Sequence, residues 1–132
     1  MAEKISVATN AINWFEIPVT DLERARKFYE RILDVSLHSM NMEGMEMLMF
    51  PSGADGNGKV GGGLVKSEYH IPGMTGTIIY LNANPRIQDV LDRVEDAGGE
   101  VTMPRTLIDE QTGYMAFFND TEGNRLGLHA GN

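Results

Sequence analysis

Three side chains that can carry acid–base or anion-binding chemistry stand near the two ends of the chain. The stretch "NWFEIPV" contains Glu16, and "RLGLHA" contains Arg125 and His129. A carboxylate and an imidazole are common general acids and bases, and a guanidinium is a common receptor for a carboxylate. Whether these groups act together depends on the elements that position them.

The segment around Glu16 is a predicted strand over residues 12–19, because core-type and non-core side chains alternate strictly there. Its core face carries Phe15, Ile17 and Val19. Its second face carries Trp14, Glu16 and Pro18. The second face therefore carries a tryptophan and a carboxylate, which must face something other than the core.

A helix and three strands are predicted to follow. The letters "TDLE" at residues 20–23 have capping-box spacing, and apolar residues then recur at helical intervals to about residue 33. Strands are predicted at residues 35–42, 45–50 and 60–66, the last after a glycine-rich loop.

The same order of elements then returns. A strand is predicted at residues 75–84, and a helix follows in which Asn84 is the expected N-cap, Pro85 the first residue, and Gly98 and Gly99 the end. Further strands are predicted at residues 100–108, 113–119 and 125–130. The apolar positions of the two helices match at a constant offset of 65 residues: Leu22, Ala25, Tyr29 and Ile32 with Ile87, Val90, Val94 and Ala97.

This repeat predicts an α+β domain made of two tandem βαβββ modules. A chain of 132 residues has room for one compact domain, which we expect over residues 1–132. The expected parts are module one at about 11–66, a linker at about 67–73, and module two at about 74–131.

Composition limits the partners and the compartment. A formal net charge of -8 disfavours nucleic acid and anionic membranes. The chain lacks both a long apolar run and an apolar secretion signal, so we expect a cytoplasmic protein. With zero cysteines, disulfides, thiolate catalysis and Cys-ligated metals are excluded. No Gly-x-Ser-x-Gly pattern occurs, so triad hydrolysis has no support in the sequence.

Two motifs carry a resemblance to a known family. The stretch "PVTDLERARKFYERIL" and the acidic turn in "NDTEGNRLGLH" resemble the glyoxalase/bleomycin resistance protein/dioxygenase family, also called the vicinal oxygen chelate superfamily. The matching positions are Asp21, Leu22, Phe28 and Tyr29 in the first motif and Asp120, Glu122 and Gly123 in the second. The resemblance implies that eight strands curl into a cup with helices outside, that Trp14 and Glu16 look into the cup, and that the protein is a homodimer.

The resemblance also implies four metal-ligand positions, and this sequence departs from the pattern at all of them. They fall on Trp14, on Gly62 or Gly63, on Thr77 or Ile79, and on Gly127. None of these residues is a good ligand for a divalent metal. We therefore predict no cofactor, although a metal at a non-standard site is not excluded.

Two residues stand beside the missing ligands. Glu16 is two positions after Trp14 and His129 is two after Gly127, so each would face the cup, where they would form an acid/base pair. In the alternative interpretation, Glu16 is solvated or paired with an arginine and His129 is frayed near the C-terminus. Arg125 lies an even number of residues before His129, so it would face the same side of the strand and bind an anion there.

A run of methionines suggests the lining of the cup. Met40 and Met42 alternate on one predicted strand, and Met45, Met47 and Met49 on the next. Methionine suits an adaptable apolar cavity, and ordinary core filling is an equal alternative. In the linker, Tyr69 and His70 either cover the mouth of the cup or are simply exposed.

Two functions follow from these observations. The first is binding of a small apolar or aromatic molecule without the usual metal, by Trp14, Met47, Met49, Ile79 and Arg125. The alternative is a metal-independent isomerase or lyase that uses Glu16 and His129. Either function has a small molecule as its partner, with no nucleic acid or membrane.

Overall fold

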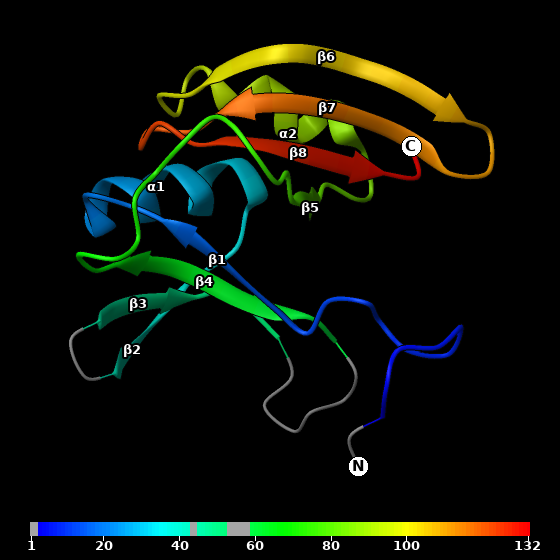
Figure 1. Ribbon diagram of the computed structural model, residues 1–132. Helices are drawn as coiled ribbons and strands as arrows, with labels where there is room; N and C mark the ends of the chain where they lie inside the picture. The colour runs from blue at the N-terminus through cyan, green and yellow to red at the C-terminus, as the bar shows by residue number, and fades with distance from the viewer. Residues whose placement is uncertain (1–2, 43–44, 53–58) are drawn as a thin grey trace.

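The computed structural model describes residues 3–42, 45–52 and 59–132 (Figure 1). The glycine-rich loop predicted before residue 60 lies largely outside them. The first half contains β1 (Trp14–Pro18), α1 (Leu22–Leu33), β2 (His38–Met42), β3 (Met45–Met49) and β4 (Gly61–Lys66). The second half contains β5 (Tyr80–Asn82), α2 (Ile87–Val94), β6 (Glu100–Asp109), β7 (Gly113–Asn119) and β8 (Arg125–Ala130). The predicted α+β class and the repeated βαβββ order are confirmed.

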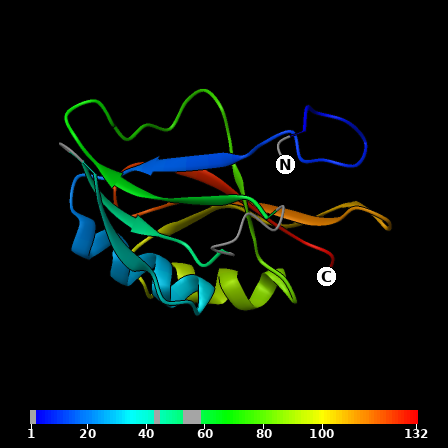
Figure 2. The same ribbon diagram turned by 90° about the horizontal axis from the view of Figure 1, so that it is seen from below.

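The eight strands form two four-stranded sheets. Their orders are β1-β4-β3-β2 and β5-β8-β7-β6, with β1 parallel to β4, β5 parallel to β8, and the remaining pairs antiparallel. Figure 2 shows both helices on the same side of the two sheets. Within the described residues the sheets do not close into a barrel, and they agree with two modules that form a curled cup with its helices outside.

The core lies between the helices and the sheet faces that they cover. The predicted core face of β1 is confirmed, since Ile17 and Val19 are buried and Phe15 packs against the same cluster. Aromatic rings join the two modules at the centre: Phe28 lies 5.9 Å from Phe118, measured between ring centroids. The helices thus pack on elements of both modules.

The turn before β8 holds the modules together by hydrogen bonds. The Tyr29 hydroxyl, fully buried in α1, donates to Asp120 Oδ2 at 2.6 Å. Burial and the nearby Asp120 carboxylate raise the pKa of Tyr29 well above its usual value, so its proton stays in this bond. Asn124 Nδ2 donates to the carbonyl of Pro18 at 2.7 Å. Module two is therefore bonded to both β1 and α1.

A buried carboxylate of the same turn binds the start of α1. Glu122 Oε1 accepts the backbone N–H groups of Thr20 and Asp21, each at 2.9 Å, and Arg24 Nε donates to Oε2 at 2.7 Å. The side chain of Glu122 is 0% exposed. Burial opposes its ionisation, but hydrogen bonds from Arg24 and the Asp21 backbone outweigh burial and hold the pKa of the carboxyl at about 2.

The first helix begins at Leu22, as its apolar spacing predicts, but its cap differs from the capping-box pattern, and the predicted start of the second helix is wrong. The N-cap of α1 is Asp21, which accepts the N–H of Arg24 at 3.0 Å, because Glu122 already occupies the N–H groups at Thr20 and Asp21. The N-cap of α2 is Arg86 and not Asn84. The Asn84 side chain instead accepts the N–H of Gly131 at 2.9 Å, and the Asn84–Pro85 peptide is cis.

The strand predicted from residue 75 is also shorter, since β5 begins at Tyr80. The preceding residues run along β8: Arg125 donates its backbone N–H to Gly73 at 3.3 Å, and Gly127 donates to Ile79 at 2.9 Å. They follow β8 as an extended connection. We call residues 67–79 the linker from here on.

Neither helix in the described part of the chain has the length and apolar character that a bilayer crossing requires.

Replacing Glu122 with glutamine should destabilise the protein, because the shape is kept while the charge that binds Arg24 and the first N–H groups of α1 is lost. We expect the free energy of unfolding at pH 7 to fall by roughly 2–3 kcal/mol, measured by urea denaturation. Glu110→Gln, on the exposed turn before β7, is the matched control. Equal losses in the two variants would contradict the role given to Glu122.

The pH dependence of stability gives a second test of this carboxylate. Its folded-state pKa of about 2 lies below the ordinary value of 4.5, so ionised Glu122 adds stability above the ordinary pKa. That stability is lost as the pH falls from about 5 toward 2. The difference in urea midpoint between the wild type and Glu122→Gln should therefore shrink between pH 5 and pH 3. A difference that stays constant would show that charge is not responsible.

Candidate functional site

A groove lies between β1, the linker and the start of β8. Its volume is about 350 Å³. The β1 strand supplies Glu16, Ile17 and Pro18, the linker supplies Ile71, Gly73, Thr75, Thr77 and Ile79, and the β8 end supplies Asn124, Arg125 and Leu126. Apolar and polar side chains thus alternate along the wall of the groove, and among the described residues Arg125 is its one cationic lining residue.

The carboxylate of Glu16 is held by two neighbours. His70 Nε2 lies 2.7 Å from Oε1, and the Trp14 indole N–H donates to Oε2 at 3.1 Å. The hydrogen bond from His70 lowers the pKa of Glu16, partial burial opposes the shift, and the Trp14 bond adds to it. Glu16 therefore stays ionised, with both oxygens occupied.

The β8 side of the groove carries one donor that is not satisfied. The Asn124 amide bonds at both ends, because Nδ2 donates to Pro18 and Oδ1 accepts the N–H of Gly73 at 3.0 Å. Arg125 Nη2 donates to the carbonyl of Gly76 at 3.3 Å. Arg125 Nε is buried and has no hydrogen-bond partner in the described ranges.

The structure does not join Glu16 and His129 by a hydrogen bond or an ion pair. His129 Nε2 lies 2.6 Å from the carbonyl of Thr112, at the far end of β8. The imidazole that meets Glu16 belongs to His70, whose side chain is 19% exposed. Sequence periodicity could not identify this partner, because the linker has no repeat that fixes where its side chains point.

Two aromatic–glycine pairs lie at or beside the metal-ligand positions implied by the family resemblance. Strand pairing sets Trp14 opposite Gly61 and Tyr80 opposite Gly127. Thr77 and Ile79 precede β5, which begins at Tyr80. Of the two glycines implied in β4, Gly63 lies on the face away from the core, because a Cβ on Gly62 would meet Phe15, on the core face.

The residues at these positions do not fit a metal ion. A Cβ on Gly127 would lie 2.4 Å from the Tyr80 ring, and one on Gly61 would lie 3.3 Å from the Trp14 ring, so each ring fills the space beside its glycine. Indole, phenol and glycine are not the His, Asp or Glu ligands that divalent metals require. No group of three or more His, Asp or Glu side chains that could hold a metal occurs in the residues that the structure describes.

The methionines of β3 face away from the helices and lie outside the groove. Met47 pairs with Met40 across β2, and Met49 pairs with Gly63 across β4. Met47 and Met49, 3% and 7% exposed, form a small apolar cluster with Val65. They thus form an apolar layer two strands away from β1.

A protein-family profile matches most of the chain. The profile describes the Glyoxalase/Bleomycin resistance protein/Dioxygenase superfamily, and the match covers residues 11–128. Among curated proteins, none matches this chain.

Solved structures share the fold. A glyoxalase/bleomycin resistance protein from Albidiferax ferrireducens is 19% identical with a TM-score of 0.66, over 92% of this chain and 98% of that one. An antibiotic binding protein from a Streptomyces species is 25% identical with a TM-score of 0.64, over 95% and 98%. A glyoxalase I variant from Zea mays is 18% identical with a TM-score of 0.63, over 90% of this chain and 45% of that one.

Divalent metals should not stabilise the chelator-treated protein, because the four positions offer no ligand set. We expect the melting temperature to change by less than about 1 °C with excess zinc, nickel, manganese or magnesium, measured by differential scanning fluorimetry. Saturating binding to the native state alone would add about 2.7 kcal/mol at one hundred times Kd. A saturable rise with one metal would reveal a site that the donor chemistry does not predict.

The contact between Tyr80 and Gly127 should show as energetic coupling. Gly127→Ala should cost about 1–3 kcal/mol, because the new methyl displaces the Tyr80 ring. Tyr80→Ala should remove most of that cost, which a double-mutant cycle measures in urea. Gly131→Ala, where a Cβ meets nothing closer than 3.8 Å, is the matched control. Additive effects at Tyr80 and Gly127 would contradict the contact.

Proposed function

The chain belongs to the glyoxalase/bleomycin resistance protein/dioxygenase superfamily, and from that premise we propose that it binds a small apolar or aromatic acid in the groove between its two sheets. No metal takes part in this binding. The proposal rests on the chemistry of the groove wall, since members of one fold family differ in function at their sites.

The observation that carries the proposal is the buried, unpartnered Nε of Arg125. Buried donors in native proteins almost always have a partner, so an unpartnered donor on a residue that lines the groove favours an acceptor supplied by a ligand. Glu16 and Asn124, the neighbouring polar groups, already have their partners. A carboxylate is the acceptor that a guanidinium binds best.

The other walls favour an apolar body on the guest. Ile71 is 77% exposed, and the partly buried Ile79 adds further aliphatic surface. Trp14, 44% exposed, stands on the same face of β1 as Glu16 and is placed to extend the apolar surface beyond the groove. Met47 and Met49 form the apolar layer farther along the same sheet. A cavity with apolar walls and few polar groups is typical of small-molecule sites.

Two further observations support binding over catalysis. The antibiotic binding protein from a Streptomyces species is similar over 95% of this chain, with 25% identity. The alternative, an isomerase or lyase with Glu16 and His129 as acid and base, requires the two groups to meet at one substrate. In the structure each is bonded to a different partner.

We also propose that the protein works as a cytoplasmic homodimer. Its sheets end in β1, β2, β5 and β6, whose outer edges are unpaired within the described chain. Unpaired edges invite pairing with another strand, and a second copy is the simplest partner.

Matched acid and amide ligands test the groove directly. Aromatic carboxylic acids, such as 2-naphthoic acid, should raise the melting temperature saturably, and the corresponding primary amides should raise it much less. Arg125→Met should weaken the binding of the acid at least about tenfold, because a hydrogen bond to a charged group contributes about 1.5–3 kcal/mol.

The control variant is Arg31→Met, which removes an exposed arginine on α1 that pairs with Asp96. It should bind the acid like the wild type. Equal affinity for acid and amide, or an unchanged affinity in Arg125→Met, would refute the role of Arg125. Failure of every small aromatic acid and amide to bind would refute the groove as their site.

A further inference from the structure

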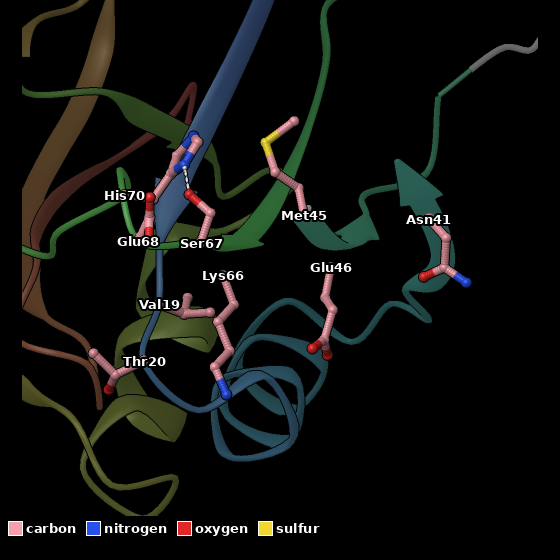
Figure 3. Close-up of a pocket in the computed structure, with 9 residues that line it drawn as sticks. All are labelled: Val19, Thr20, Asn41, Met45, Glu46, Lys66, Ser67, Glu68 and His70. Carbon is pink, nitrogen blue, oxygen red and sulfur yellow. Dashed lines mark hydrogen bonds between the residues drawn. The ribbon is translucent and has the colours of Figure 1, made fainter. Parts of the chain in front are cut away.

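The linker forms a chain of hydrogen bonds at a second cavity, independent of the proposed binding in the groove. Figure 3 shows this cavity, of about 690 Å³, with Ser67 and His70 on its wall. Ser67 Oγ lies 2.7 Å from His70 Nδ1. His70 Nε2 lies 2.7 Å from Glu16 Oε1. A hydroxyl, an imidazole and a carboxylate are thus connected in that order.

The partners determine where the protons lie. A carboxylate only accepts, so the His70 nitrogen that faces Glu16 carries a proton. In the neutral ring the other nitrogen, Nδ1, is then an acceptor, and the Ser67 hydroxyl is its donor. This is the arrangement in which a base can take the proton of a serine.

Other contacts hold each member in place. The Trp14 indole N–H donates to the second oxygen of Glu16 at 3.1 Å. The backbone N–H of Tyr69 donates to Ser67 Oγ at 3.1 Å, and the N–H of His70 donates to the Ser67 carbonyl at 3.3 Å. The side chains of His70 and Glu16 are 19% and 33% exposed, so both are partly shielded from water.

We propose that Ser67 is a nucleophile, activated by His70 and positioned by Glu16, that cleaves small esters entering this cavity. A nucleophile within hydrogen-bond reach of a base, and a base oriented by a third group, is the geometry that covalent catalysis requires. Ser67 and His70 would touch the reacting atoms. Glu16 acts through His70 and is a positioning residue.

The reaction is a transfer of the acyl group to Ser67 and then to water. Ser67 Oγ attacks the ester carbonyl carbon while its proton passes to His70 Nδ1. The bond between the acyl carbon and the leaving oxygen breaks, and that oxygen takes the proton from Nδ1. A water molecule then gives a proton to the same nitrogen and attacks the acyl carbon. The bond between that carbon and Ser67 Oγ breaks, the acid is released, and Oγ takes the proton back from Nδ1, which restores the hydroxyl.

A backbone donor for the oxyanion of the intermediate lies next to Ser67 in the chain. The backbone N–H of Glu68, next along the chain from Ser67, has no hydrogen-bond partner in the described residues. The N–H that follows the nucleophile forms part of the oxyanion hole in other serine hydrolases. Met45 supplies apolar wall for the acyl group, and Glu46, Lys66 and Glu68 line the same cavity.

The backbone around Ser67 differs from that around the nucleophile in serine hydrolases with a Gly-x-Ser-x-Gly pattern. That pattern marks a turn between a strand and a helix. Here Ser67 follows β4 directly, and the next element is the strand β5 and not a helix. The Gly-x-Ser-x-Gly pattern is therefore not expected at Ser67.

The probe is 4-nitrophenyl acetate with the full chain. We expect a burst of 4-nitrophenolate and one acetyl group on Ser67, located by peptide mass spectrometry. Ser67→Ala should abolish that adduct and slow the release at least about tenfold, as should His70→Gln. Glu16→Gln should lower kcat with little change in KM. Ser39→Ala, which removes an exposed serine of β2, should react like the wild type.

A second variant keeps the test decisive if Ser67→Ala disturbs the linker. The chain has no cysteine, so Ser67→Cys and Ser39→Cys each introduce a single thiol. The thiol at position 67 should react with iodoacetamide at least about tenfold faster than that at position 39, and His70→Gln should remove the difference. Acetylation on lysines alone, together with equal thiol rates, would overturn the proposal.

Discussion

The buried carboxylate of Glu122 is the interaction on which the arrangement of the two modules depends. It belongs to module two, yet its oxygens accept the N–H groups of Thr20 and Asp21, directly before α1, and bind the guanidinium of Arg24 in module one. The start of a helix presents a partial positive charge, so a carboxylate is stabilised there. Because the Glu122 side chain is buried, losing the Arg24 charge would leave its carboxylate without an ion-pair partner.

The same turn determines the path of the linker. Asn124 binds Pro18 on β1 and Gly73 in the linker, and Arg125 binds Gly73 and Gly76. The linker is thereby held between the two sheets, and the groove exists as the space that this path leaves. The contact of His70 with Glu16 ties the other end of the linker to β1. The groove and the serine site thus share a single structural cause.

Each module carries an aromatic ring opposite a glycine on the face of its sheet that is turned away from the core. Trp14 is paired with Gly61 and Tyr80 with Gly127, and a Cβ on the glycine would lie 3.3 Å from the Trp14 ring and 2.4 Å from the Tyr80 ring. The core beneath, with Phe28, Tyr29 and Phe118, is independent of these pairs because it lies on the other face of the sheets. The residues on the open face can therefore vary without changing the packing of the core.

Local pattern in the sequence determined the helices, most of the strands and the core face of β1, because alternation and helical spacing act between near neighbours. It also indicated that Trp14 and Glu16 share a face and that the metal pattern is absent. Only the tertiary structure decided what Glu16 and Arg125 meet, which residue caps α1 and how the linker runs. Those features depend on contacts such as the bond from Thr20 to Glu122, 102 residues apart, whose partners no local spacing can select.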